Sequence, residues 1–282
     1  ITGNFLNNIG TRYGGGIDNE ATITNMTTNF IRNTVNSPYQ GDLGFGQAYG
    51  GAIYNAGNMT NISGDFIDNR THNSFTSGIT SYVISSGGGI YNGDYRNDFG
   101  TTTNPSIINS ISGNFVGNSA TIENNYSFNS GGNRYFYADG GAITNKYNST
   151  IQTINADFYN NFAKVENTGS VTGASAIWMT ARGGAIYNNG TINNITGNFI
   201  NNHATVNNGG NLDAENLQLD TYGGAIFNSG TINLSAVNDS ILFSGNTATT
   251  GGAIYNSGTI TMNIGANKQI RFATISDDVY NN

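Results

Sequence analysis

Residues 183–202 read GGAIYNNGTINNITGNFINN, and copies of two parts of this segment recur along the whole chain. The first part is Gly-Gly, then Ala or Gly, then Ile, and it begins at Gly14, Gly50, Gly87, Gly140, Gly183, Gly223 and Gly251. The second part is Phe-x-x-Asn, and it begins at Phe5, Phe30, Phe66, Phe115, Phe158, Phe199 and Phe243. The two motifs alternate strictly. Self-similarity at regular spacing is the signature of a repeat architecture, so we expect a rod of stacked units rather than a globule.

Composition narrows the classes of function. Of the 282 residues only 10% are charged, the formal net charge is −7, and there is no cysteine. A nucleic-acid partner requires clustered Lys and Arg, so none is expected for this acidic chain. The lack of cysteine excludes disulfides and thiol chemistry. No stretch approaches the roughly 18 apolar residues of a membrane-spanning helix.

Apolar residues within each repeat stand singly at fixed offsets. Ile192 and Ile195 lie seven and four residues before Phe199, and the other copies keep these offsets. No helical periodicity persists, whereas short segments bounded by Gly, Asn and Thr are typical of strands. Each unit of about 25 residues therefore predicts three short strands. The predicted fold class is all-β, a single-stranded parallel β-helix (β-solenoid) of about seven coils with lateral loop insertions.

In-register stacking predicts ladders of identical side chains. The Asn after each Gly-Gly motif is expected to pair its amide with the coils above and below, because a buried amide without a partner is costly. The Phe rings are expected to fill the core. The predicted ladder residues are Asn55, Asn92, Asn145, Asn188, Asn228 and Asn256, with Phe30, Phe66, Phe115, Phe158 and Phe199. If Ile186 faces the core, strand alternation turns Tyr187 outward.

Five insertions separate a Phe-x-x-Asn motif from the next Gly-Gly motif. They occupy residues of about 34–49, 70–86, 119–139, 162–182 and 203–222. Because they enter at the same point of successive coils, they are expected on one side of the rod, where solenoids commonly bind partners. The candidate partner-binding residues are the aromatic ones at Tyr135, Phe136, Tyr137 and Trp178. The alternative is that these aromatics only close the side of the solenoid.

The two alternating motifs carry a resemblance. GGA(I/L/V) alternating with FxxN is similar to the chlamydial polymorphic outer-membrane proteins, which are type V autotransporter passenger domains, and the resemblance covers essentially the whole chain. It implies a right-handed parallel β-helix that is exported and displayed as an adhesin. The chain opens part-way through a repeat at Ile1, so we expect one β-helix over residues 1–282, as a fragment of a longer passenger. The repeat pattern weakens over 268–282, which is expected to be the end of the array.

Function and location follow from the resemblance as expectations. We expect a cell-surface, outer-membrane or secreted protein of a Gram-negative-type bacterium. Its expected role is that of a non-catalytic adhesin or interaction scaffold that binds a protein or glycan of a host or neighbouring cell. Contact with the membrane itself is expected only through a C-terminal barrel outside these residues.

The rival function is that of a polysaccharide lyase or glycoside hydrolase, which parallel β-helices also host. Such enzymes need carboxylates that converge on one groove. Asp65 and Asp157 precede the Phe of their motifs, where other coils have Asn, so a shared turn role is favoured. His72 and His203 lie in non-adjacent coils, so no metal site is expected, and no cofactor is expected either.

Overall fold

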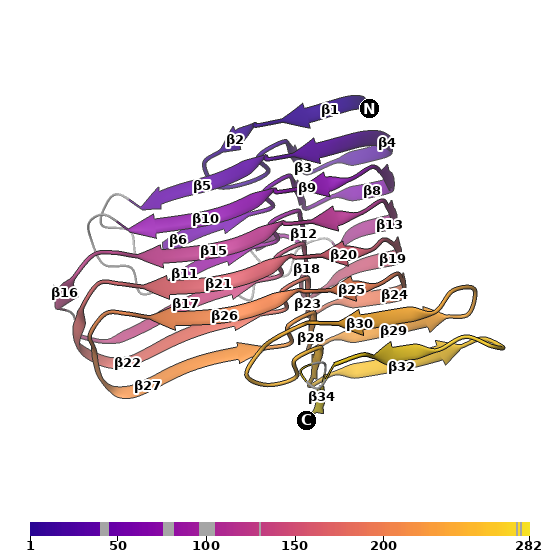
Figure 1. Cartoon of the computed structure of the whole chain (residues 1–282). Helices are drawn as coiled ribbons and strands as arrows, with labels where there is room; N and C mark the ends of the chain where they lie inside the picture. The colour runs from indigo at the N-terminus through magenta and orange to yellow at the C-terminus, as the bar shows by residue number, and fades with distance from the viewer. Residues whose placement is uncertain (40–44, 76–81, 96–104, 130, 275, 277) are drawn as a thin grey trace.

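The computed structural model describes all residues except 40–44, 76–81, 96–104, 130, 275 and 277. The described residues form an all-β structure in which every strand pairing is parallel and each strand pairs with its counterpart one coil away (Figure 1). No α-helix occurs in these residues, and thus no helix long and apolar enough to span a membrane. The predicted parallel β-helix is confirmed.

The strands of the Gly-Gly motifs stack into one column of three-residue strands, which we call the Ile column. It consists of β3 (Ile17–Asn19), β7 (Ile53–Asn55), β12 (Ile90–Asn92), β18 (Ile143–Asn145), β23 (Ile186–Asn188), β28 (Ile226–Asn228), β31 (Ile254–Asn256) and β34 (Val279–Asn281).

A second sheet contains two further columns that share the long strand β4 (Thr22–Ile31). The Thr-Ile column follows the Ile column in each coil and adds β8 (Asn58–Ser63), β13 (Ser106–Ser112), β19 (Ser149–Asn155), β24 (Thr191–Thr196), β29 (Thr231–Ala236) and β32 (Thr259–Ile264). The Phe column adds β1 (Thr2–Leu6), β9 (Phe66–Ile67), β14 (Phe115–Val116), β20 (Phe158–Tyr159), β25 (Phe199–Ile200), β30 (Ile241–Ser244) and β33 (Ile270–Phe272).

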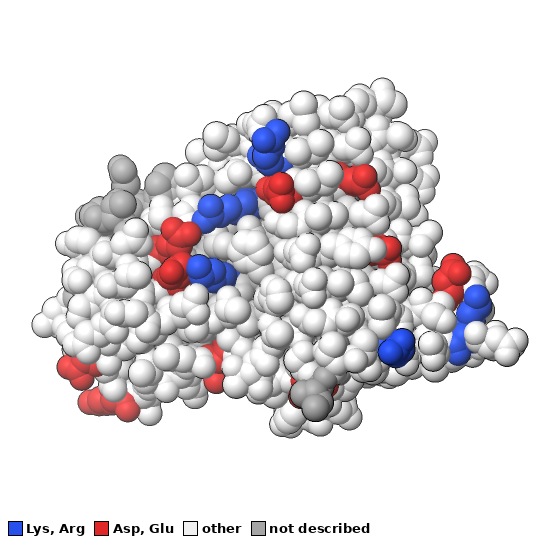
Figure 2. Space-filling view, in the orientation of Figure 1, with Lys and Arg blue, Asp and Glu red and all other residues white. Residues whose placement is uncertain are grey.

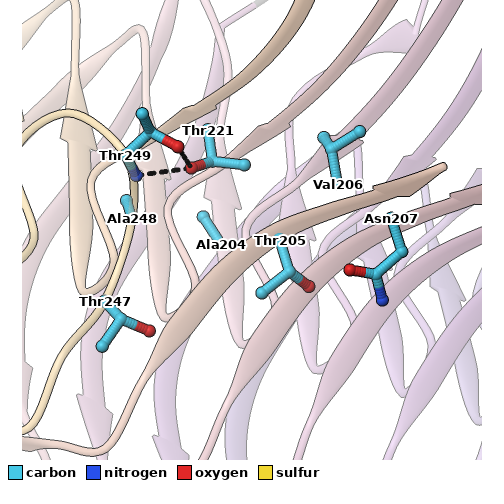
Figure 3. A pocket seen from close by; sticks show the side chains of 8 residues that line it. All are labelled: Ala204, Thr205, Val206, Asn207, Thr221, Thr247, Ala248 and Thr249. Carbon is cyan, nitrogen blue, oxygen red and sulfur yellow. Dashed lines mark hydrogen bonds between the residues drawn. The ribbon is translucent and has the colours of Figure 1, made fainter.

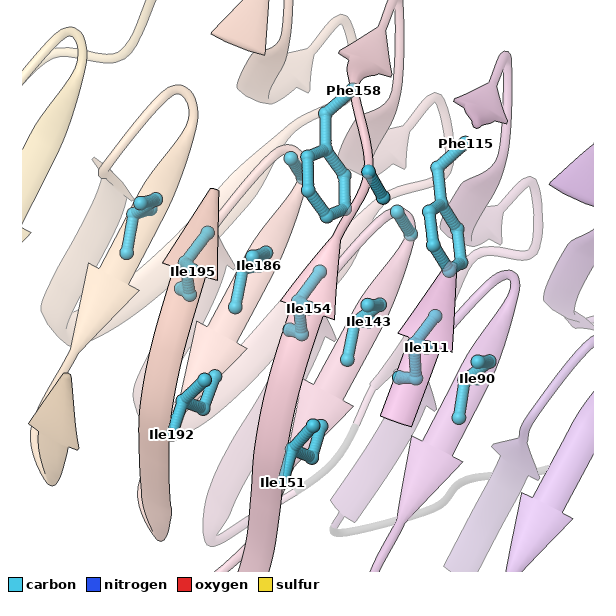
Figure 4. Packing of buried hydrophobic residues seen from close by; sticks show 14 of the residues in the cluster. Ile90, Ile111, Phe115, Ile143, Ile151, Ile154, Phe158, Ile186, Ile192 and Ile195 are labelled. Carbon is cyan, nitrogen blue, oxygen red and sulfur yellow. The ribbon is translucent and has the colours of Figure 1, made fainter. Parts of the chain in front are cut away.

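These three columns enclose the main core, which is a stack of repeated side chains. Ile186, Ile192, Ile195 and Phe199 are all fully buried, and each is in register with its counterparts in the neighbouring coils. Figure 4 shows the isoleucine rows of this core. Successive Phe rings stack, with centroids 4.7 Å apart between Phe158 and Phe199. The core is therefore continuous from coil to coil, because each apolar residue packs on the equivalent residue of the next coil.

The Gly-Gly motif makes the corner before each strand of the Ile column, and its two glycines have different roles. Gly183 has a φ of +63°, in the left-handed region that glycine adopts without penalty. A Cβ on Gly184 would lie 2.2 Å from the carbonyl oxygen of Gly224 in the next coil. The first glycine thus permits the turn and the second permits close stacking of the corners.

The Phe-x-x-Asn motif makes a corner of its own. Its third residue has a positive φ, for example +54° at Arg32, +53° at Asp68 and +53° at Asn201. Its Asn side chain then stacks on the Asn of the next coil: Asn161 Nδ2 donates to Asn202 Oδ1 at 3.0 Å. This second amide ladder runs through Asn8, Asn33, Asn69, Asn118, Asn161, Asn202 and Asn246. This second ladder was not predicted from the sequence, although the regular recurrence of Asn in the Phe-x-x-Asn motif could have indicated it.

The five insertions, expected as lateral loops, are instead largely strands that form a lateral lobe beside the coils (Figure 1). The chain leaves each coil along what we call the outgoing sheet, made of β2 (Ile9–Gly10), β5 (Thr34–Tyr39), β10 (Arg70–Phe75), β15 (Ser119–Asn124), β21 (Phe162–Asn167) and β26 (His203–Asn208). It comes back along the return sheet, made of β6 (Phe45–Tyr49), β11 (Tyr82–Ser86), β16 (Phe128–Asn129), β17 (Asn133–Asp139), β22 (Val171–Arg182) and β27 (Leu212–Tyr222).

The lobe has a core of its own between these two sheets. It contains Ile122 and Val165 from the outgoing sheet and Phe136, Ile177 and Met179 from the return sheet. Strand formation in the insertions follows from this packing, because each insertion can pair with the one above and bury one face.

A third cluster fills the corner where the outer face of the return sheet meets the outer face of the Ile column. We call this corner the seam. Tyr49 packs there against Tyr54 and Tyr91, and all three are at most 2% exposed. Tyr187 does turn away from the main core, yet it is only 5% exposed because the seam covers it. Its predicted outward position is therefore correct, but it is not a solvent-exposed residue.

Candidate binding surface

The return sheet places the predicted aromatic residues on two different faces. In β17, Tyr135 and Tyr137 point outward and are half-buried, whereas Phe136 points into the lobe core and is 3% exposed. Alternation along a strand requires this division. Phe136 is consequently a core residue and is removed from the candidate surface.

The insertions of two successive coils meet on this outer face. Tyr135 is in register with Trp178 of β22, and the two rings stack with centroids 4.7 Å apart and planes within 3°. The ring centroid of Tyr82, from β11 of the preceding coil, lies 6.0 Å from that of Tyr135. Tyr82, Tyr135, Tyr137 and Trp178 are all half-buried, and we call them the aromatic strip. Half-buried rings held by strands are pre-ordered for contact, because little side-chain freedom remains to be lost.

A buried ion pair anchors the strip at the seam. Arg182 donates from Nε and Nη2 to the two carboxylate oxygens of Asp139, at 2.7 and 2.9 Å, and Asp139 is fully buried. The guanidinium also lies 4.7 Å from the ring centroid of Tyr137 and 4.8 Å from that of Tyr187. This bidentate geometry with aromatic faces on both sides suits arginine specifically.

The pKa shifts around this pair are explained by burial and by the neighbouring charges. Burial by itself would lower the pKa of Arg182, but the Asp139 carboxylate and the neighbouring Tyr187 raise it overall. Burial also raises the pKa of Tyr137, and Arg182 partly offsets this. Asp139 is thus the buried partner of a permanent cation, and both of its carboxylate oxygens accept hydrogen bonds from Arg182.

The two carboxylates considered from the sequence accept hydrogen bonds from backbone N–H groups. Asp65 accepts a 2.8 Å hydrogen bond from the backbone N–H of Asn114 in the next coil, and Asp157 accepts one of 2.7 Å from Asn198. Asn29 does the same for the N–H of Asp65, at 3.0 Å. Asn and Asp therefore share one role at this position, which is to satisfy an N–H of the following coil.

The two histidines are placed apart and each has neighbours of its own. His72 of β10 lies 2.9 Å from the hydroxyl of Thr121, and His203 of β26 lies 2.8 Å from that of Thr247. Burial lowers the pKa of His72 to about 4 and also lowers that of His203. Among the described residues no group of His, Asp and Glu is arranged to hold a metal ion.

The predicted Asn residues form a hydrogen-bonded ladder through the coils. Asn145 donates to Asn188 at 2.8 Å, and Asn188 donates to Asn228 at 2.7 Å. The ladder as a whole runs through Asn19, Asn55, Asn92, Asn145, Asn188, Asn228, Asn256 and Asn281. Phe30, Phe66, Phe115, Phe158 and Phe199 stack in succession. These residues are scaffold, and they fix the spacing at which the lobe presents its side chains.

The face of the molecule in Figure 2 carries few charges. On the outgoing sheet, Arg70 pairs with Glu123 at 3.0 Å and Lys164 pairs with Glu166. Opposite charges thus neutralise each other locally. The largest part of this face carries no charged side chain.

One comparison with known proteins gives a result. Residues 240–257 match the family model described as the Chlamydia polymorphic membrane protein repeat. No curated protein and no solved structure gives a significant match. The matched segment includes β30 and β31, a coil in which Phe243 and Gly251 are joined by a short connection without an insertion. The chain therefore carries a repeat of the polymorphic membrane protein type.

Proposed function

We propose that this chain, with its repeat of the polymorphic membrane protein type, is a surface-displayed part of an autotransporter passenger that binds other cells. The location is the cell surface or outer membrane of a Gram-negative-type bacterium, or the medium after release. The matched repeat belongs by its description to membrane proteins, and this supports the location. A rod of stacked coils suits display, because each added coil lengthens it without a new fold.

The role proposed is adhesion to a protein or glycan of a host or neighbouring cell, without catalysis. The observation that carries it is the aromatic strip, in which Tyr135 and Trp178 stack and remain half-buried on a lobe outside the main core. Aromatic residues at the centre of an interface contribute large buried area at low entropic cost. Carboxylates in bonded roles at Asp65, Asp139 and Asp157 support the non-catalytic part of the proposal.

The test uses Trp178→Ala and the double variant Tyr135→Ala/Trp178→Ala, with Asn193→Ala on the plain repeat face as the matched control. Binding of the purified proteins to cultured animal cells and to an array of immobilised glycans is measured together with the melting temperature. The strip variants are expected to lose at least about tenfold in binding while they stay folded, and the control is expected to bind normally. Trp178 is the only tryptophan, so its fluorescence reports contact directly. Unchanged binding by a folded double variant would place the adhesive site elsewhere.

A further inference from the structure

The lateral lobe ends inside the chain, at the coil that follows β26 and β27. In that coil only a short segment joins Phe243 to Gly251, so no insertion continues the two lobe sheets. Within the described part of the chain, the free sides of β26 and β27 pair only at their ends, through the bridges His203↔Thr247 and Tyr222↔Thr250. The remaining edges of both strands have no backbone partner there. We call this region the open end of the lobe.

The lobe core is uncovered at the open end. Leu217 and Leu219 of β27 are in register with Ile177 and Met179 of β22, which are fully buried. The two leucines continue the same inward-facing rows but are 44% and 38% exposed. On the opposite strand, Val206 continues the inward row of β26 and is only half-buried. Apolar residues that an insertion in the following coil would cover are thus left in solvent.

A hollow lies between the two strands at this point (Figure 3). It has a volume of about 290 Å³, and Ala204, Val206, Thr221, Thr247 and Ala248 are among the residues that line it. Its inner end is fixed by the hydroxyl of Thr221, which donates to the hydroxyl of Thr249 at 2.9 Å. The hollow occupies the place that the insertion strands of the next coil would fill.

The backbone at the open end is oriented for pairing. Thr221 accepts a hydrogen bond from the N–H of Thr250, at 3.1 Å, so its backbone groups face the open side. In a parallel ladder, alternate residues direct both their N–H and C=O groups to the same neighbour. The backbone N–H and C=O groups of Leu219 and Leu217 therefore face the open side as well. On β26, the N–H of Ala204 donates to the carbonyl oxygen of Thr247 at 2.9 Å. By the same alternation, the backbone N–H and C=O of Val206 also face the open side.

The edge of β27 lacks two of the usual protections against strand addition, and its only charges are acidic. It is eleven residues long and contains neither Pro nor Lys. At the other end of the lobe, the outgoing sheet ends in the two-residue strand β2, which pairs only with Thr34 and Val35 of β5, and the return sheet ends in β6, which has five residues. β5 also contains Pro38, which cannot donate to a ladder. The lobe therefore has one blunted end and one open end.

Charge indicates what kind of segment fits. Residues 203–222, which form β26 and β27, contain three acidic residues, Asp213, Glu215 and Asp220, and no Lys or Arg. Asp213 and Glu215 are exposed on the edge strand. Opposite charges on neighbouring strands stabilise pairing, and like charges oppose it. An added strand is favoured if it carries apolar residues toward the hollow and basic residues at the intervening positions.

We propose that the open end of the lobe binds an extended, basic segment of a partner protein by strand addition. The segment continues the sheet of β27, hydrogen-bonds to the backbone of Leu217 and Leu219, and inserts alternate apolar side chains against Val206 and the leucines. Its Lys or Arg residues lie beside Asp213, Glu215 and Asp220. This site is separate from the aromatic strip and does not depend on the adhesive function proposed for it.

The test uses the whole chain and a nine-residue fluorescent peptide in which valine and lysine alternate, with blocked termini. Binding is measured by fluorescence anisotropy. We expect saturable binding, and at least a fivefold loss when alternate backbone nitrogens of the peptide are methylated so that its pairing edge has no donors. An alternating valine–glutamate peptide and a peptide with the same valines and lysines in two blocks are expected to bind at least fivefold more weakly.

Variants of the chain locate the site. Leu219→Asn is expected to weaken peptide binding at least fivefold, whereas Gln218→Asn, on the other face of the same strand, and Trp178→Ala are expected to leave it unchanged. Equal binding of the methylated and unmethylated peptides, or of the block peptide, would overturn strand addition in favour of simple charge attraction. Failure of every peptide to bind, or self-association of the chain that Leu219→Asn abolishes, would overturn the proposed basic occupant.

Discussion

Asn188 donates a 2.7 Å hydrogen bond from its side-chain amide to Oδ1 of Asn228, one coil further along the β-helix. Both residues are fully buried, and Asn188 in turn accepts a bond of 2.8 Å from Asn145. Each amide is therefore donor and acceptor at once, and the ladder holds three strands of the Ile column in one register. This arrangement leads to the first prediction.

Asn188→Ala should destabilise the fold by about 2–4 kcal/mol. The substitution removes the acceptor of a buried N–H of Asn145 and the donor to the buried Oδ1 of Asn228. Chemical denaturation measures the difference. Asn193→Ala is the control, since Asn193 is exposed on the neighbouring strand β24, and a change within about 0.5 kcal/mol is expected. Equal losses in the two variants would mean that the ladder contributes nothing specific.

Phe199→Ala should cost about 3–5 kcal/mol, because the ring stacks between Phe158 and Phe243 and its loss leaves a cavity between coils. Tyr187→Ala should cost about 2 kcal/mol, since Tyr187 stacks on Phe227 and lies against Arg182 in the seam. The same denaturation assay compares them. A loss for Tyr187→Ala as small as that of an exposed residue would show that the seam is not packed in solution.

Asp139→Asn should destabilise by about 3–5 kcal/mol, because Arg182 then keeps its charge without its buried partner. The positions in register with this pair are Ser86 in the coil before and Tyr222 in the coil after. The double variant Asp139→Ser/Arg182→Tyr copies these neutral neighbours and should be more stable than Asp139→Asn alone. A double variant that loses as much stability as Asp139→Ser and Arg182→Tyr together would indicate that the two charges do not interact.

Stability should fall between about pH 6.5 and pH 4 because of His72. Burial, with Arg70 acting in the same direction and Glu123 against it, lowers the pKa of His72 to about 4, whereas the unfolded chain has the ordinary value of about 6.5. Protonation in this window therefore favours the unfolded chain, by up to about 3 kcal/mol once pH 4 is reached. The measurement is the stability difference between wild type and His72→Gln as a function of pH. A difference that stays constant from pH 7 to pH 4 would contradict the lowered pKa.

No turnover of polysaccharides is expected. Incubation with a panel of acidic and neutral polysaccharides should release neither reducing ends nor unsaturated products, because Asp65 and Asp157 each accept a backbone N–H of the next coil. Activity that disappears in Asp65→Asn or Asp157→Asn would establish the rival enzymatic function instead.

The coils were predictable because their motifs recur in register. The spacing of Ile192, Ile195 and Phe199 indicated which residues face the core, and stacking of identical coils then implied parallel strands. The seam was harder to foresee. Strand alternation turned Tyr187 away from the core, but only the return sheet, which the motifs do not specify, decides that this outer face is covered.

The strands of the lobe could not be predicted from the repeat motifs, because they pair in register although their sequences have no motif in common. Tyr135, Phe136 and Tyr137 are consecutive aromatics, so alternation allowed either face to be the inner one. Pairing with β22 decides it: Phe136 lies beside Met179 in the lobe core, and Tyr135 lies beside Trp178 outside. The sequence thus included the core residue Phe136 among the candidate binding residues, and whether Tyr135, Tyr137 and Trp178 bind a partner stays a prediction.

The two Asn ladders make the rod electrically polar. In both, Nδ2 of each coil donates toward the C-terminal side, as Asn161 does to Asn202 and Asn188 does to Asn228. Amide dipoles of about 3.5 D therefore add along the axis, while the strand backbones contribute little net dipole. The N-terminal side of every coil offers carbonyl oxygens and the C-terminal side offers amide hydrogens. Any coil or partner that extends these ladders can consequently attach in one orientation only, head to tail.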